Sequence, residues 1–191
     1  MFRELRQRNK TFSGVFARAA TPVSLVATGR TERGVVELVS GNCFSVLGVR
    51  PFLGRELTDA DDRTPLAHPV AVLSYRYWNR RLAADPGIVG KTVRIDNYPF
   101  TVIGVAPPAF YGIEVGAAPD AWIPMMMQPQ IFGRGRPSFN EVGWGWLSIF
   151  GRRSPGIGES KARAGLDVAF QQIRSEGGVA RFWRRSNDAR I

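Results

Sequence analysis

The chain has little of the chemistry on which enzymes most often depend. Its 191 residues include one cysteine, Cys43, and one histidine, His68. A single cysteine excludes a disulfide within the chain and a metal site built from several thiolates. A single histidine removes most of the metal-binding and acid–base repertoire. The chain also lacks an apolar run of about 20 residues, which a membrane-spanning helix needs.

A secretory signal peptide is missing as well. The first residues, "MFRELRQRNKTF", are basic but have no apolar stretch behind them. If the chain belongs outside the cytoplasm, we expect its targeting sequence to lie beyond these 191 residues.

What the chain does contain is typical of a folded protein, with 44% apolar and 22% charged residues. Its 21 glycines and 13 prolines predict many turns and a strand-rich domain with short connections. A formal net charge of +10 attracts a chain to nucleic acid, anionic membrane surfaces or acidic proteins. The basic residues are spread from Arg3 to Arg190, which favours solvated faces or membrane proximity over a concentrated nucleic-acid surface.

Two octapeptides are nearly identical, "FSVLGVRP" at 44–51 and "FTVIGVAP" at 100–107. The first follows Ser40–Asn42, which can accept backbone N–H bonds at a helix start, and its Gly48 suits a left-handed helix stop. The second follows Asp96-Asn97, a pair that tolerates turn geometry, and therefore continues a hairpin as its second strand. We predict a short helix and a strand, and no duplicated unit.

Hydrophobic periodicity places the other elements. An amphipathic N-terminal helix is predicted from Leu5, Phe12, Val15 and Phe16, loosening at Ser13-Gly14. We further predict a hairpin turning at 29–34, a buried strand at 68–74, a helix from Ser74 to 85–87, an extended segment at 119–127, a loop at 128–145, and a strand and turn at 146–156. The clearest helix is 159–176, with Ala162, Leu166, Ala169 and Ile173 on one stripe.

Few residues are candidates for catalysis. His68 could act as a base and Cys43 as a nucleophile across the fold, but neither has a suitable partner near it in sequence. We interpret His68 as a loop residue entering a strand and Cys43 as inert packing.

Ligand-binding candidates are equally few. Asp59, Asp61 and Asp62 could bind a hard cation, but residues 63–65 break the calcium-loop pattern, so a turn or helix-start role is favoured. The "GRGRP" at 133–137 lacks the strand–loop–helix context of a phosphate cradle. Trp144 and Trp146 are interpreted as a rim contact or core. We expect no catalytic, cofactor-binding or metal-binding residues, and a non-catalytic α+β module.

Several phrases, in this order and spacing, carry a family resemblance: "VSGNCFSVLGVRPFLGR", "VAVLSYRYWNRR", "GKTVRIDNYPFTVIGVAP", "PDAWIPMM" and "LSIFGRRSPGIGESKARAGLD". Over residues 1–175 the chain resembles the extracytoplasmic (periplasmic) core domain of MacB-like ABC transporter permeases, and within that group the large acidobacterial-type permeases. The resemblance implies an α+β fold, with a porter-like lobe of βαβ units and a small mixed lobe inserted at roughly 50–90. Residues 176–191 do not match, and we expect a frayed tail or a truncation. Cys43 stands where the family more commonly has an aromatic residue.

The resemblance implies a domain without catalysis, located at the extracytoplasmic face of the bacterial inner membrane. Such a domain transmits ATP-driven conformational change for efflux or for lipid and lipoprotein handling. The implied partners are transmembrane helices of the same permease, a cytoplasmic ABC ATPase, a second permease copy and a periplasmic adaptor. The basic N-terminal helix, with Arg3, Arg6, Arg8 and Lys10, would lie near lipid phosphates.

Two alternatives belong to other classes. The first is a free-standing basic α+β domain that binds nucleic acid, whose affinity would fall steeply with salt. The second is an enzyme that uses His68 and the carboxylates of 59–62. Bound metal, or loss of turnover on His68→Ala, would support it.

Overall fold

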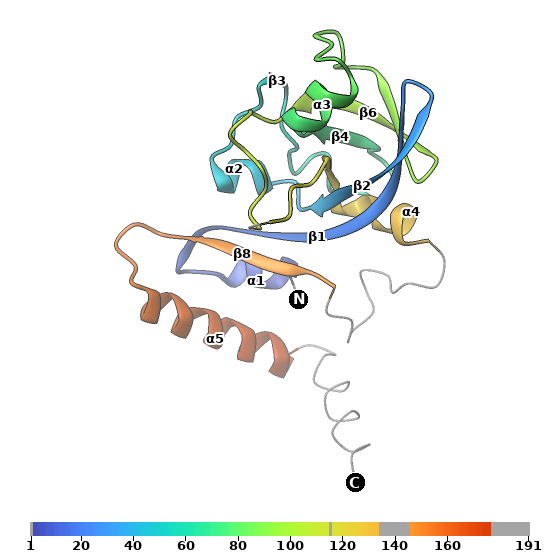
Figure 1. Ribbon diagram of the computed structural model, residues 1–191. Coiled ribbons are helices and arrows are strands. Elements are labelled where there is room, and N and C mark those ends of the chain that lie inside the picture. The colour runs from blue at the N-terminus through green and yellow to red at the C-terminus, as the bar shows by residue number, and fades with distance from the viewer. Residues whose placement is uncertain (1, 115, 134–145, 177–191) are drawn as a thin grey trace. The chain divides into compact units, whose positions relative to one another are not determined.

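Strand β1 (Phe12–Ala27) belongs to two units of the chain at once. The computed structural model describes residues 2–114, 116–133 and 146–176. One unit, called the terminal unit here, comprises the described residues of Met1–Ala17 and Pro137–Ile191, and the central unit is Arg18–Arg136. The chain passes from one to the other within strand β1 (Phe12–Ala27), drawn in blue in Figure 1. The small lobe expected at roughly residues 50–90 stays a prediction.

The terminal unit combines helix α1 (Phe2–Arg8), the beginning of β1, strand β8 (Ser148–Arg153) and helix α5 (Glu159–Glu176). Strand β8 pairs with β1, and Phe16 stacks on Phe150 with ring centroids 5.6 Å apart. Leu5, Val15 and Ile173 form a small buried core. The predicted strand near residue 148 and the helix at 159–176 are therefore confirmed.

The N-terminal helix exists, but its predicted length is wrong. It ends at Arg8, and Phe12, Val15 and Phe16 lie in strand β1. The reason is local, because the side-chain oxygen of Asn9 accepts hydrogen bonds from the backbone N–H groups of Thr11 and Phe12, at 3.0 and 2.8 Å. An asparagine that bonds the backbone ahead of it offers a turn in place of the next helical hydrogen bonds.

The stripe predicted on α5 is largely confirmed. Ala162, Ala169 and Ile173 are buried, whereas Leu166 is 37% exposed. The buried face of α5 therefore consists of small residues and one isoleucine.

The central unit is built on a ring of paired strands. Its strands are the rest of β1, β2 (Arg30–Val39), β4 (Val70–Leu73), β5 (Thr92–Ile95), β6 (Tyr98–Val105) and β7 (Ala121–Pro124). They pair in the order β2-β7-β4-β6-β5-β1, and β1 pairs again with β2, which closes the ring. Short strand β3 (Leu53–Gly54) joins the end of β6. The β2–β7 and β4–β6 pairs are parallel.

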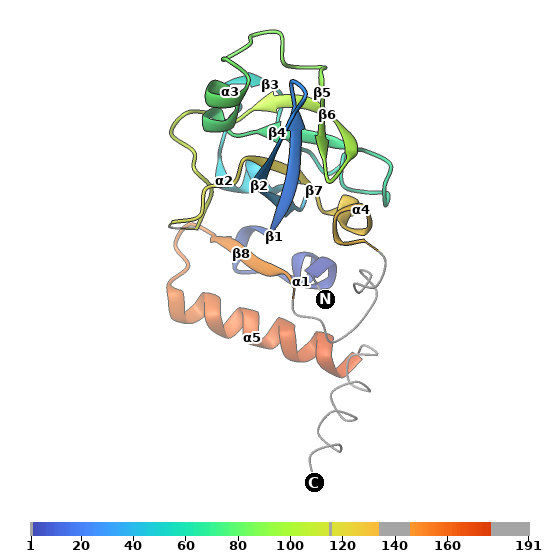
Figure 2. The same cartoon turned by 45° about the vertical axis from the view of Figure 1, so that its right-hand side comes forward.

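Both predicted hairpins exist. The β1–β2 hairpin turns at Thr28-Gly29, which is tighter than the predicted turn at 29–34 because residues 30–33 already pair as strand. The β5–β6 hairpin turns at Asp96 and Asn97, whose φ angles are 45° and 65°, and Figure 2 shows its two strands side by side. Asp and Asn tolerate this left-handed backbone better than most residues.

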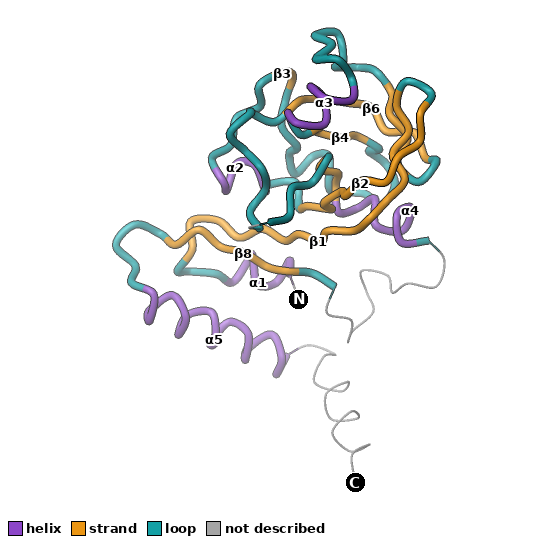
Figure 3. Tube along the Cα trace, viewed as in Figure 1, coloured by secondary structure: helices purple, strands orange, loops and turns teal. Residues whose placement is uncertain are grey.

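The two octapeptides adopt the two predicted structures (Figure 3). The first forms helix α2 (Cys43–Leu47), which ends at Gly48 with φ 69°. The second forms most of strand β6. No side-chain hydrogen bond caps α2 at its N-cap, Asn42; the backbone carbonyls of Ser40 and Asn42 accept the N–H groups of Cys43 and Val46, at 2.9 and 3.0 Å.

Helix α3 (Tyr75–Arg81) begins as predicted, because the Ser74 hydroxyl accepts the Tyr77 N–H at 3.1 Å. It ends at Arg81, earlier than the expected 85–87, because Ala83 and Ala84 are left-handed. Its buried residues Tyr77 and Trp78 belong to the main core.

The segment after β7 is more regular than predicted. A short 3-10 helix, η1 (Met125–Met127), leads directly into helix α4 (Gln128–Phe132), where a loop was expected. Proline in the first turn of α4 suits a helix start, because that turn has no intrahelical N–H partners to lose. The remainder of the expected loop, 134–145, lies outside the described residues.

The core of the central unit lies inside the ring. Apolar side chains from every strand of the ring meet there with those of α3. The largest fully buried members of this core include Phe100, Leu38, Leu73, Ile95 and Ile123. Packing of this kind leaves little freedom for the strands to move against one another.

Candidate functional site

The first residue of the central unit is a buried arginine. Arg18, on β1, is 4% exposed. Its Nη2 lies 2.8 Å from Oε1 of Glu37 on β2, and its Nη1 donates to Oε2 of Glu114 at 2.8 Å. The second oxygen of Glu37 accepts the indole N–H of Trp122, on β7, at 3.0 Å. We call these four residues the Arg18 cluster.

The electrostatics of the Arg18 cluster hold three strands together. Burial raises the pKa of Glu37, and Arg18 and Trp122 act in the opposite direction. Glu114 reaches the cluster from a segment outside the strands, and its side chain is 56% exposed. Removal of one partner from a buried pair leaves an uncompensated charge and costs about 3–5 kcal/mol. The cluster therefore fixes the relative positions of β1, β2 and β7.

An aromatic group lies next to the Arg18 cluster. Trp122 contacts Phe44 edge to face, with centroids 5.6 Å apart, and Phe110 at 5.1 Å. Phe44 and Phe110 also contact each other, at 6.0 Å. Such pairs add to the stabilisation from burial alone. Helix α2 is thereby attached to β7 through its one large buried ring, Phe44.

The acidic segment after β3 is held by hydrogen bonds. The carboxylate of Asp61, a residue that is 5% exposed, accepts one hydrogen bond from each terminal nitrogen of Arg55, both at 2.8 Å. It also accepts hydrogen bonds from the backbone N–H and the hydroxyl of Thr58, at 2.9 Å each. Burial by itself raises the pKa of Asp61, but the hydrogen bonds from Arg55 and Thr58 outweigh it and lower the pKa to about 2. Its carboxylate is thus occupied by protein donors.

Asp62 connects two distant segments. One of its oxygens accepts the N–H of Gly41, just before α2, at 3.2 Å. The other accepts the N–H of Met126, in η1, at 2.7 Å. For Asp61 and Asp62, though not for Asp59, hydrogen bonds of this kind confirm the predicted role as acceptors of backbone N–H groups. We call Arg55, Thr58, Asp61 and Asp62 the acidic clamp.

The candidate catalytic pair is not assembled. Cys43 is 3% exposed at the beginning of α2, and burial raises the pKa of its thiol, which disfavours the nucleophilic thiolate. His68 is exposed, just before β4, as a loop residue entering a strand. These environments fit the predicted roles of both residues.

Two other candidate residues are described by the structure. Asp59 is exposed, and Trp146 is half-buried just before β8. Trp144 and most of 133–137 lie outside the described residues. Over the described part of the chain, no three His, Cys, Asp or Glu side chains gather as a metal site would require.

The basic residues at the N-terminus follow the shortened helix. Arg3, Arg6 and Arg8 lie on α1, and Lys10 follows it. Arg3, Arg6 and Lys10 are exposed. Across the described ranges, none of the helices is both long enough and apolar enough to cross a membrane.

Sequence reasoning missed the Arg18 cluster, although a sign of it was present. Arg18 interrupts the apolar run "VFARAATPV", and Glu37 interrupts "GVVELV". A charged residue in an otherwise apolar strand is seldom fully buried unless it is paired. The two interruptions have opposite charge, but only the β1–β2 register brings them together.

The fold of the chain is shared by two solved structures, a periplasmic region and an extracellular domain. The chain shares its fold with the periplasmic region of MacB from Actinobacillus actinomycetemcomitans, with a TM-score of 0.67 at 19% identity over 88% of this chain and 71% of that one. It also shares its fold with the extracellular domain of the ABC-type transporter YknZ from Gram-positive bacteria, with a TM-score of 0.64 at 14% identity over 91% and 80%.

The sequence identifies the family to which this fold belongs here. The model of the MacB-like periplasmic core domain matches residues 2–167, and the chain belongs to this family. It is an extracytoplasmic domain of a MacB-like ABC transporter permease. A comparison with curated proteins found no match. Domains of this family are generally not catalytic, and the family match gives no support to the nucleic-acid alternative.

Proposed function

We propose that this domain transmits ATP-driven conformational change across the membrane, for efflux or for lipid and lipoprotein handling. A cytoplasmic ABC ATPase supplies the change, and transmembrane helices of the same permease carry it to the extracytoplasmic face of the bacterial inner membrane. Two copies of the domain then shift against each other, and a periplasmic adaptor is a further partner. The observation that carries this proposal is the family match over residues 2–167.

Transmission requires bodies that move without deforming. The closed ring of strands, the Arg18 cluster and the acidic clamp each restrain the central unit at a different place. A packed body with few internal degrees of freedom passes on a rotation applied at one point, whereas a soft body absorbs it. The proposal includes the absence of catalytic, cofactor-binding and metal-binding residues, and a small lobe inserted at roughly 50–90.

The proposal is tested in the complete transporter, reconstituted with its ATPase, by distance measurements between spin labels. Asn79→Cys places a label on the exposed face of α3, while the buried Cys43 is replaced by serine. We expect the distance between labels on two copies to change when the ATPase is trapped with ATP. An ATPase variant unable to bind ATP is the control.

A second pair of spin labels tests whether the central unit is rigid. Labels at Arg50→Cys and Asn79→Cys within one copy, mixed with unlabelled copies, report on the central unit alone. We expect this distance to stay constant through the ATP cycle. An unchanged distance between copies contradicts transmission, and a changed distance within one copy contradicts a rigid central unit.

We also propose that the basic N-terminal segment lies against lipid phosphates. Replacement of Arg3, Arg6 and Lys10 by alanine removes three exposed positive charges from it. Each such charge near an anionic surface contributes about 1 kcal/mol, so binding to anionic liposomes should weaken strongly. Unchanged liposome binding would end this part of the proposal.

A further inference from the structure

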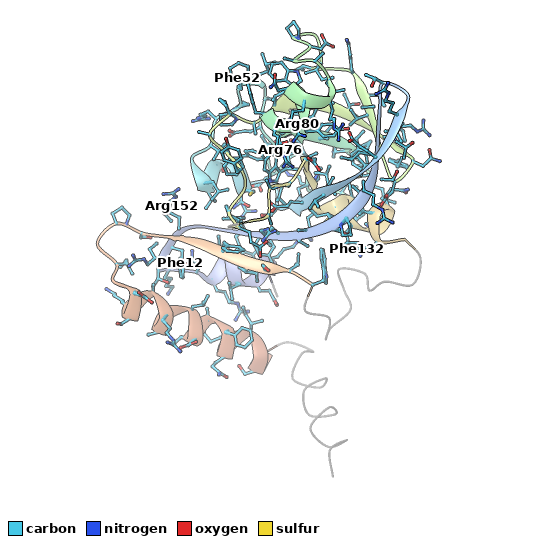
Figure 4. The ribbon with its side chains drawn as sticks, viewed as in Figure 1. Phe12, Phe52, Arg76, Arg80, Phe132 and Arg152 are labelled. Carbon is cyan, nitrogen blue, oxygen red and sulfur yellow. The ribbon has the colours of Figure 1, made fainter. Side chains whose placement is uncertain are left out.

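A polar cavity opens between β2 and α3 in the central unit. Its volume is about 160 Å³, and its lining contains four arginines, two carboxylates and a tyrosine: Glu32, Arg33, Arg76, Tyr77, Arg80, Arg81 and Asp120. Figure 4 labels Arg76 and Arg80, which project from neighbouring turns of α3. The closed ring holds β2, and the core holds α3 through Tyr77, so the walls are fixed.

The two carboxylates position two of the arginines. Glu32 Oε2 lies 2.7 Å from Nη2 of Arg81. Asp120 Oδ1 accepts Nη2 of Arg76 at 3.0 Å, and its other oxygen accepts the Val35 N–H at 3.1 Å. Both acids are thereby engaged by cationic or backbone donors.

Two of the four arginines in the lining have no carboxylate partner among the described residues. Arg33 and Arg80 are exposed, and over the described residues their guanidinium groups form no hydrogen bond or ion pair. Tyr77 adds no negative charge, because burial, with nearby Glu32 and Asp120, raises its pKa to about 12. Four guanidinium groups therefore surround a small cavity that contains only two carboxylates.

The chemistry and size of the cavity limit its ligand. Ligand pockets for drug-sized molecules measure about 300–1,000 Å³, so this cavity accepts one small group. Guanidinium groups donate pairs of parallel N–H bonds that match the oxygens of a phosphate. We propose that this cavity binds a single phosphate group, either as free inorganic phosphate or as the headgroup of an anionic phospholipid, through Arg33 and Arg80. This inference does not rest on the transmission proposed above.

The first test is calorimetric titration of the 191-residue chain with inorganic phosphate at low salt. We expect saturable binding that weakens as chloride is raised. Arg33→Ala and Arg80→Ala should each weaken it about tenfold, since each removes hydrogen bonds to a charged group. The matched control is Arg50→Ala, which removes the same charge from a side chain that is 87% exposed and outside the cavity. Circular dichroism verifies that each variant is folded.

The second arm separates the two sources of phosphate. It measures binding to vesicles of phosphatidylcholine alone and of phosphatidylcholine with phosphatidylglycerol in equal parts. Loss of vesicle binding in the Arg33→Ala/Arg80→Ala double variant, with Arg50→Ala unaffected, assigns the cavity to a lipid headgroup. Free phosphate binding lost in the same double variant, without a vesicle effect, assigns it to the soluble ion. If the double variant matches Arg50→Ala in both arms, the inference is overturned.

Discussion

The octapeptides at 44–51 and 100–107 are almost the same string, yet they depend on their neighbours in opposite ways. Phe44 and Phe100 are both buried, at 1% and 0% exposure. The first octapeptide buries little beyond its phenylalanine, whereas the second buries nearly every residue from Phe100 to Val105. The second is itself a strand of the ring, whereas the first is a short helix held by contacts from other segments.

The shared glycine has a different task in each octapeptide. Gly48 adopts φ 69°, and an added Cβ would meet nothing within 4 Å, so its task is conformational. Gly104 lies in a strand, and an added Cβ would come within 2.3 Å of the backbone oxygen of Arg55 and 2.9 Å of that of Leu53. Its task is to let β3 approach β6. Two nearly identical sequences can therefore require glycine for unrelated physical reasons.

The largest effect should come from Gly104→Ala. The new methyl group collides with backbone atoms of Leu53 and Arg55, which cannot rotate away as side chains do. We expect a loss of about 4 kcal/mol in the free energy of unfolding, at the upper end of single substitutions. Urea denaturation followed by circular dichroism measures it. A loss below that of Gly48→Ala would show that β3 is free to move aside.

A second effect concerns the contacts that hold the first octapeptide. Asp62→Ala leaves the N–H groups of Gly41 and Met126 without their carboxylate acceptor. A buried donor left unsatisfied costs about 1–3 kcal/mol, and we expect a total loss of about 3 kcal/mol. Asp59→Ala, at an exposed position of the same turn, is the matched control and should cost much less. Equal losses for the two variants would contradict the clamp.

The same segment predicts a pH dependence through Asp61. The pKa of Asp61 is about 2 in the folded chain, against an ordinary value of 3.8 for aspartate, so the folded state favours the ionised form. The stabilisation is fully present above about pH 4 and disappears as the pH falls towards 2. Asp61→Asn should lose about 2 kcal/mol at pH 7 relative to wild type. Urea midpoints of the two proteins should converge between pH 4 and pH 2; parallel midpoints across that range would refute the assignment.

The smallest effect should come from Gly48→Ala. Alanine in the left-handed region costs about 1 kcal/mol, and the surrounding space is open. Gly48→Asn should cost less than alanine, because asparagine tolerates this conformation. Thermal melting of the two variants distinguishes them. Equal melting temperatures for Ala and Asn would show that a contact, and not φ, determines the residue here.

The features that the sequence predicted correctly depend on interactions between neighbouring residues. The serine cap of α3, the left-handed stop at Gly48 and the Asp96-Asn97 turn are each specified by a few neighbouring residues. The failures have local and distant causes. Asn9 stopped the N-terminal helix through its own side chain, a feature that apolar spacing does not report.

The Arg18 cluster and the arginine-lined cavity could not be predicted in the same way. Arg18 and Glu114 are separated by 96 positions, and Glu32 and Arg81 come from different elements. Such pairs depend on strand register, which is set by the whole hydrophobic pattern and not by either residue. The resemblance to a family supplied the fold class, but it gave no information about these contacts.

The closed ring of the central unit has a consequence for how this domain meets other proteins. Each of its six strands is paired on both sides with another strand of the ring. A peptide that binds by adding itself as a strand needs a free sheet edge, and along the paired lengths of these strands it would first have to displace a resident strand. Another protein that binds the central unit should accordingly contact side chains on its helices and loops. Such a complex can associate and dissociate without unfolding either partner.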